Sequence, residues 1–431
     1  MNKKFSPTIK SVLIIALAML AVFQVSHLWL VNFTNRNFFL YLQARFPPTA
    51  PDGASAFAQP FRIISGVGDG RFDMRYSDIA GSDEWEFGKL AVNSILQSGV
   101  LVSADEISFE SVLQRPVLIY EYAFDMCAET FSRALGRRSG TILTDAGIET
   151  FRAIAVQPPE AQSSSPVLRV FFISDARIWE YSFLFGNPQR ALSYTFEVAP
   201  TNALRKHFVA TEGGFVPHVA LNGFSYRALT AENPFRDPQG LFTLSHVRSR
   251  VEPFFDNPAT IIPSVSVENV YTFSNRNTLV RYLENAVLEY TSYRTIGRAV
   301  QGNLIADFSA ALAFVNDDPF VINEIFLQNH ETRHGRSHVF WFDYVIDNRP
   351  LIMTQKWYTR PYPRCSDPLL APIEVTVDQG RVVRYRRLAY TFHLSPDILR
   401  WKEARDLDMD GYFTLGFPIG SGPIIELEVL Y

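Results

Sequence analysis

Three residues of this sequence have the spacing of a zinc hydrolase motif. His330, Glu331 and His334 fit the pattern H-E-x-x-H, in which two imidazoles one helical turn apart bind zinc and the glutamate activates a water molecule. That chemistry requires a helix, but residues typical of β-strands lie on both sides of the motif. We therefore expect a solvated turn at the tip of a hairpin. A membrane-anchored zinc hydrolase that uses these three residues is the alternative.

A second group has the spacing of a calcium loop. Asp406, Asp408 and Asp410 alternate along the chain and Gly411 follows them, as in the first half of an EF-hand-like loop. The twelfth position, where such a loop needs a bidentate glutamate, is Phe417. We expect an exposed acidic turn and no cofactor. A calcium-tuned envelope interaction module remains a further alternative.

The N-terminus predicts a membrane anchor. Lys3, Lys4 and Lys10 precede an uncharged, mostly apolar segment from Ser11 to Val31. As a helix it would be about 31 Å long, which matches the hydrocarbon core of a bilayer. The lysines favour a cytoplasmic tail at residues 1–10 and a single-pass signal anchor at residues 11–31. Small-residue pairs suitable for signal cleavage lie inside the apolar run, so an uncleaved anchor is favoured over a signal peptide.

Small and polar residues of this segment are candidates for a contact within the membrane. Ala18, Ala21 and Gln24 are of the types that mediate helix–helix packing in lipid. The alternative is that the polar residues lie near the outer interface and meet water.

Composition limits the kind of partner. The chain has 431 residues, of which 47% are hydrophobic and 14% aromatic, which is typical of a globular, β-rich protein. Without its first 31 residues it has 37 basic residues (40 minus 3) against 44 acidic ones. This acidic balance argues against nucleic acid and against an anionic membrane surface as partners. Cys127 and Cys365 either form one long-range disulfide or are two buried thiols.

The helices and strands that the sequence predicts indicate an α+β fold. After the membrane anchor we expect a multidomain extracytoplasmic part with antiparallel sheets and packed helices. Proline and small residues mark a juxtamembrane linker. The predicted parts are the linker at 32–60, an N-terminal α+β domain at 61–202, a middle α+β domain at 203–300 and a C-terminal α+β domain at 301–431.

Local patterns predict individual elements within these domains. Helices are expected from Ser82 onward, at 124–135 with Gly136 as its stop, at 303–314, and from Ser395-Pro396-Asp397 onward. Strands are expected at 116–122, 167–174, 177–185, 191–198, 321–327, 339–346, 373–377, 381–390 and 424–430, with a β-meander at 270–290. A helix at 278–290 is the alternative to the last strands of the meander.

Two stretches of the C-terminal half resemble the YycH/YycI family of Gram-positive bacteria, whose members are membrane-anchored regulators encoded beside an essential cell-wall sensor kinase. The first stretch runs from Leu241-Phe242 to Leu288-Glu289-Tyr290, and the second from Phe314 to Tyr385. The chain is most similar to a divergent, clostridial-type member. The resemblance implies an extracytoplasmic α+β protein without catalytic residues.

The resemblance implies a regulatory function that acts through partner proteins. Such a protein would be anchored in the cell membrane by one helix with a cytoplasmic N-terminus. It would bind a YycI-like sister protein and modulate a cell-envelope sensor histidine kinase, and it would not be an enzyme.

Overall fold

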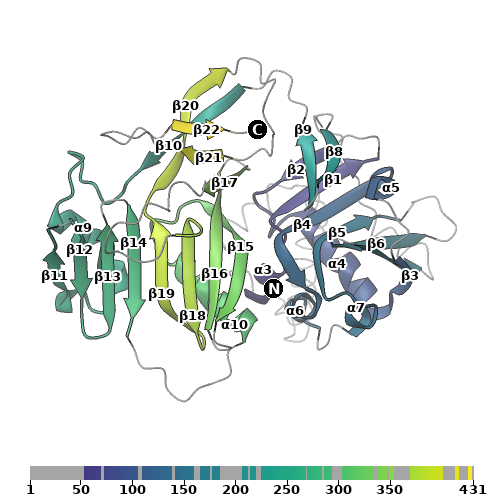
Figure 1. Cartoon of the computed structure of the whole chain (residues 1–431), viewed down its shortest axis with the longest axis horizontal. Coiled ribbons are helices and arrows are strands. Elements are labelled where there is room, and N and C mark those ends of the chain that lie inside the picture. Colours follow the sequence, from purple (N-terminus) through teal and green to yellow (C-terminus); the bar gives the residue numbers. More distant parts are fainter. Residues whose placement is uncertain are drawn as a thin grey trace, which may run out of the picture. The chain divides into compact units, whose positions relative to one another are not determined.

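A computed structural model describes most of the chain after residue 52. The described residues are 53–68, 72–104, 109–137, 141–159, 166–174, 177–184, 206–211, 214–219, 225–267, 269–283, 286–293, 303–333, 337–346, 349–353, 369–400, 413–416 and 426–429. They form an α+β fold with two large, mainly antiparallel sheets and few helices (Figure 1). The predicted fold class is confirmed at this level.

The first sheet has seven strands in the order β2-β1-β4-β5-β6-β7-β3. Its strands are β1 (Arg62–Val67), β2 (Phe72–Arg75), β3 (Val100–Ala104), β4 (Pro116–Cys127), β5 (Thr150–Gln157), β6 (Val167–Ile173) and β7 (Ile178–Leu184). The predicted hairpin of β6 and β7 is confirmed by their antiparallel pairing. The strand predicted at 191–198 lies outside the described residues.

Helices accompany this sheet, and one of them differs from its prediction. They are α3 (Gly53–Phe57), α4 (Asp83–Ser98), α5 (Phe109–Leu113), α6 (Ala128–Ala134) and α7 (Thr141–Asp145). The predicted start of α4 is confirmed, because the Ser82 side chain accepts a hydrogen bond from the Trp85 N–H. The helix predicted at 124–135 begins only at residue 128. Alternate burial of Phe124 and Met126 keeps that stretch in β4, and Gly136 at φ 81° ends the helix as expected.

The second sheet has eleven strands. Ten of them follow the order β11-β12-β13-β14-β19-β18-β16-β17-β21-β22, and the eleventh, β15, pairs with β16. They are β11 (Ile262–Val265), β12 (Tyr271–Ser274), β13 (Thr278–Leu283), β14 (Val287–Ser292), β15 (Glu324–Arg333), β16 (Ser337–Ile346), β17 (Arg349–Met353), β18 (Ile373–Asp378), β19 (Arg381–Leu388), β21 (Phe413–Gly416) and β22 (Glu426–Val429). The meander is confirmed and the alternative helix at 278–290 is wrong. Because β14 pairs with β19, the boundary predicted at residue 300 falls within one sheet.

Two local predictions in this part have opposite outcomes. Gln379 and Gly380 adopt positive φ values of 51° and 77° in the turn between β18 and β19, as the hairpin pattern predicts. The helix start predicted at Ser395-Pro396-Asp397 is wrong, because these residues lie inside β20 (Thr391–Arg400). The register of β20 with β10 (Ser225–Glu232) shifts across these three residues. A proline, which has no N–H to donate, is tolerated in a strand at such an irregularity.

The remaining elements of the second part are few. They are α9 (Leu244–Val251), η2 (Glu252–Phe254), η3 (Pro258–Thr260) and α10 (Leu304–Asn316). β8 (Lys206–Thr211) and β9 (Gly214–Val219) form a separate two-stranded sheet. The helix predicted at 303–314 is confirmed as α10, and Asn303 caps it through the Ile305 N–H. Within the described residues no helix has the length and apolar character needed to cross a membrane, and the predicted anchor at 11–31 lies outside those residues.

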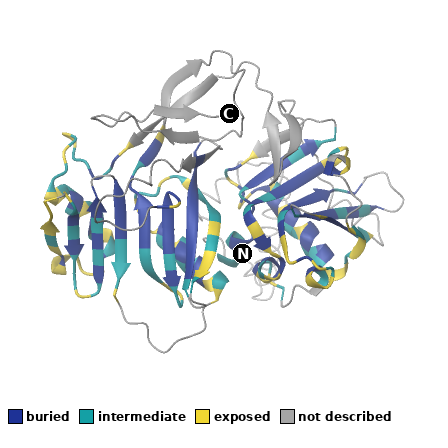
Figure 2. Ribbon diagram, in the orientation of Figure 1, coloured by how far each residue is buried: buried dark blue, intermediate teal, exposed yellow. Residues whose placement is uncertain are grey.

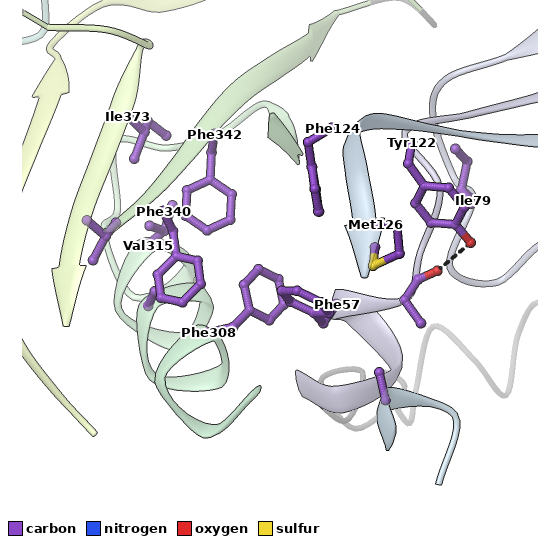
Figure 3. Close-up of a cluster of buried hydrophobic side chains, with 14 of the residues drawn as sticks. Phe57, Ile79, Tyr122, Phe124, Met126, Phe308, Val315, Phe340, Phe342 and Ile373 are labelled. Atoms are coloured by element: carbon purple, nitrogen blue, oxygen red, sulfur yellow. Dashed lines mark hydrogen bonds between the residues drawn. The ribbon is translucent and has the colours of Figure 1, made fainter. Parts of the chain in front are cut away.

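Buried residues occur in both sheets (Figure 2), and many of their side chains belong to one hydrophobic cluster. Phe57 of α3 connects the two parts, since its ring lies 5.3 Å from Phe308 of α10 and 6.3 Å from Phe124 of β4 (Figure 3). Tyr122 of β4 also donates a hydrogen bond to the Ala58 carbonyl. The end of the segment predicted as a linker, residues 53–60, thus contributes to the core.

Candidate functional site

The predicted zinc motif lies on the hairpin of β15 and β16. His330 and Glu331 occupy consecutive positions of β15, so their side chains point to opposite faces of the strand. The His330 ring contacts Phe124 at 5.0 Å and Phe57 at 5.6 Å, whereas Glu331 is exposed and accepts a hydrogen bond from Arg333 at 2.9 Å. These two residues are therefore on a strand and not on the helix that the zinc chemistry requires. His334 lies outside the described residues.

A carboxylate–imidazole pair lies close to this hairpin. Asp307 Oδ2 of α10 is 2.6 Å from His338 Nδ1 of β16, and Asp307 Oδ1 accepts the Gly380 N–H at 2.6 Å. The two side chains are only 1% and 7% exposed. Both oxygens of a buried carboxylate are thus satisfied. The pair joins α10 to the sheet at two points. The sequence signal for it is the single acidic residue of an otherwise apolar helix.

A second buried cluster links the loop after α10 to β19. Asp318 Oδ2 accepts a hydrogen bond from the Tyr385 hydroxyl at 2.8 Å and lies 2.8 Å from Arg387 Nε. Phe320 lies under the Arg387 guanidinium at 5.8 Å. Burial raises the pKa of Tyr385 well above its ordinary value. The phenol therefore stays neutral and donates a hydrogen bond to the Asp318 carboxylate.

The opposite face of the second sheet has a row of alternating charges. Glu289 is bound by Arg281 at 2.6 Å and by Arg386 at 3.2 Å, and Arg386 Nη1 lies 3.7 Å from Glu374. Trp341 Nε1 donates to Glu374 at 3.3 Å. These residues are direct partners across β13, β14, β19, β18 and β16. Because a register slip would place like charges opposite each other or break the pairs, the row specifies the alignment of five strands.

Asp343 is a buried acid beside this row. It follows Trp341 by two positions on β16, so it faces the same side of the sheet. Burial raises the pKa of Asp343 from 3.8 to about 8. This carboxyl is therefore mostly protonated at neutral pH, as expected where desolvation disfavours the charged form.

The exposed apolar residues include a set on β3, an edge strand of the first sheet (Figure 1). Val100 is 64% exposed, Leu101 42% and Val102 55%. The neighbouring Leu184 of β7 is 64% exposed. β3 contains neither proline nor a charged residue. Open strand edges usually contain one or the other, because an unprotected edge pairs with other chains.

Other terminal strands have such protection. β11 contains Pro263, β2 contains Asp73 and Arg75, and β22 contains Glu426 and Glu428. Among these described edges, β3 is the one whose residues favour pairing with an added strand.

The other candidates from the sequence are not brought into a site. Asp406, Asp408, Asp410, Ala18, Ala21, Gln24 and Cys365 all lie outside the described residues. Cys127 is exposed and has no disulfide partner in the described part of the chain. Across the same residues, no group of three or more His, Cys, Asp or Glu side chains is arranged to hold a metal ion.

Comparison of the chain with protein-family models, curated proteins and solved structures finds no match.

Proposed function

We propose that this protein is a membrane-anchored, extracytoplasmic interaction module that acts without catalysis. It binds a YycI-like sister protein and modulates a cell-envelope sensor histidine kinase. The observation that carries the interaction part of the proposal is the exposed, uncharged edge of β3. The kinase and the sister protein come from the sequence resemblance, and the anchor comes from the apolar segment Ser11–Val31.

The β3 edge supports binding of an extended segment from a partner. An edge strand offers unpaired backbone donors and acceptors, and an added strand satisfies them while its side chains contact those of the edge. Val100 and Val102 supply apolar side chains next to those backbone groups. The register with β7 shifts between Leu101 and Ser103, so the strand is irregular at Val102. An irregularity of this kind increases the local twist and limits pairing at an edge, so an added strand would have to follow that twist.

The buried ionisable groups support a binding function over a hydrolytic one. Asp307 contacts His338, Asp318 contacts Arg387, and Glu289 lies between two arginines. Each contact joins separate elements of the fold, so these groups already have a role in packing.

The proposed topology places residues 1–10 in the cytoplasm, one helix at 11–31, and the α+β part outside the cell membrane.

The experiment that tests this function compares two surface substitutions in cells. Val102→Lys places a charge on the β3 edge, and Leu241→Lys is the matched control because Leu241 is 62% exposed and lies outside both large sheets. The readout is a reporter of the proposed partner sensor kinase, measured at equal expression and equal melting temperature of the variants. We expect Val102→Lys to abolish regulation and Leu241→Lys to retain it. Full regulation by the Val102→Lys protein would contradict the proposal.

A further inference from the structure

His330 lies where the two sheets meet. Its ring is surrounded by Phe57 of α3 at 5.6 Å, Phe124 of β4 at 5.0 Å and Phe340 of β16 at 6.5 Å. Phe57 and Phe124 belong to the first part of the fold, and Phe340 belongs to the second sheet. An imidazole is thus packed among aromatic rings from both parts.

We propose that His330 is a proton-sensitive latch, which in its neutral form packs α3 and β4 against β15 and which loosens this contact when it is protonated. The inference goes beyond the proposed function, because it concerns how the two parts of the fold are held together.

The chemistry of the ring nitrogens supports this assignment. His330 Nδ1 is buried and has no hydrogen-bond partner. A neutral imidazole needs only one N–H, so it tolerates an unprotonated Nδ1 in apolar surroundings. Protonation places an N–H and a positive charge at that position, where neither has a partner. Burial, together with the nearby His338, lowers the pKa of His330 to about 4.

The charged groups on the surrounding elements do not compensate a proton on His330. No ionisable residue occurs in α3, and the ionisable groups of the other elements are already paired, exposed or directed elsewhere. On β4, Glu121 is paired with Arg62, and Asp125 is exposed. On β16, His338 contacts Asp307 of α10, and Asp343 lies on the opposite face of the strand. On β15, Glu331 accepts a hydrogen bond from Arg333, and Glu324 accepts the Asp78 N–H.

The linkage between protonation and opening has a defined sign. A histidine exposed by opening titrates near 6.5, whereas the packed one titrates near 4. The open form therefore binds more protons between these two values. Its population rises by up to about tenfold for each pH unit that the solution is acidified within that window. Above pH 6.5 the closed contact keeps its full stability.

Hydrogen exchange of the full chain tests the latch. Exchange is measured between pH 4.5 and 6.5, corrected for intrinsic rates, in peptides from α3 and β15 and in a reference peptide from the hairpin of β6 and β7. We expect the opening constant of α3 and β15 to rise about tenfold per pH unit on acidification. We expect the reference hairpin to show no such rise, because local opening leaves it folded.

Two variants identify the group that titrates. His330→Phe and His330→Gln both remove the titration, and the phenylalanine also fills the aromatic site, so both should give a pH-independent opening constant. His246→Gln is the control, because His246 of α9 is a partly buried histidine that contacts the Pro234 carbonyl instead. It should keep the response of the unmodified chain. A flat profile in the unmodified chain, or an unchanged slope in both His330 variants, would overturn the proposal.

Discussion

Replacement of the buried acid Asp343 by asparagine should change how stability depends on pH. In the folded chain the Asp343 carboxyl keeps its proton up to about pH 8, whereas in the unfolded chain it loses the proton near pH 3.8. The folded state therefore binds more protons between these values, and the free energy of unfolding falls as the pH rises through the window. One pH unit corresponds to about 1.4 kcal/mol, so the loss at pH 7 is about 4 kcal/mol.

Asp343→Asn removes this loss, because the amide stays neutral at every pH. At pH 4 the folded acid and the amide are both neutral and of similar size, and the unfolded acid has only just passed its midpoint, so the two proteins should differ by less than about 1 kcal/mol. At pH 7 the variant should be more stable by up to about 4 kcal/mol. The assay is urea denaturation of the detergent-solubilised full chain at pH 4, 5.5 and 7, followed by tryptophan fluorescence. His330 is present in both proteins, so its own titration cancels in the difference.

An exposed acid supplies the control for this experiment. Asp317→Asn removes an exposed acid at the end of α10 and should leave the pH profile unchanged. A difference between Asp343→Asn and the unmodified chain that stays constant from pH 4 to 7 would refute the reasoning. It would mean that Asp343 ionises at the same pH in the folded and unfolded states.

Two further substitutions test packing and the charge row. Gly88→Ala should destabilise the chain by about 1–3 kcal/mol in urea denaturation, because a Cβ at this position would lie 2.4 Å from the Tyr120 ring; an unchanged midpoint would show that the ring moves aside freely. Glu289→Gln leaves Arg281 and Arg386 without their shared carboxylate, so thermal unfolding should show a loss of about 3–5 kcal/mol. A loss below about 1 kcal/mol would mean that the row is solvated.

Local signals in the sequence predicted elements wherever the deciding contact is itself local. The Ser82 hydroxyl caps α4 through a residue three positions away, and Gly136 and Gly380 adopt positive φ values that favour glycine. The predictions failed where pairing with a strand far away in the sequence determines the local structure. Ser395-Pro396-Asp397 has the residue types of a helix start, but the flanking residues Leu394 and Ile398 pair with β10, more than 160 positions earlier, and this pairing keeps the stretch in a strand.

The buried charged pairs of the candidate region were less predictable than the fold, because their contacts join residues far apart in the chain. Asp307 and His338 lie 31 positions apart, and Glu289 and Arg386 lie 97 positions apart. Neither pair has a spacing that a local pattern recognises. An isolated acid on an apolar helix signals that a buried partner exists, because a buried carboxylate needs one. It does not identify the partner without the topology of the sheet.

The zinc motif illustrates why the same residues have a different role on a strand. Zinc binding by this motif requires a helix, on which residues four apart lie one turn apart. His330 and Glu331 instead lie on β15, which ends at Arg333, and His334 lies outside the described residues. On β15, alternation instead directs His330 inward and Glu331 outward. The local β-pattern therefore predicts the hairpin, but the packing of His330 against Phe57 and Phe124 depends on residues more than 200 positions earlier, which no local pattern identifies.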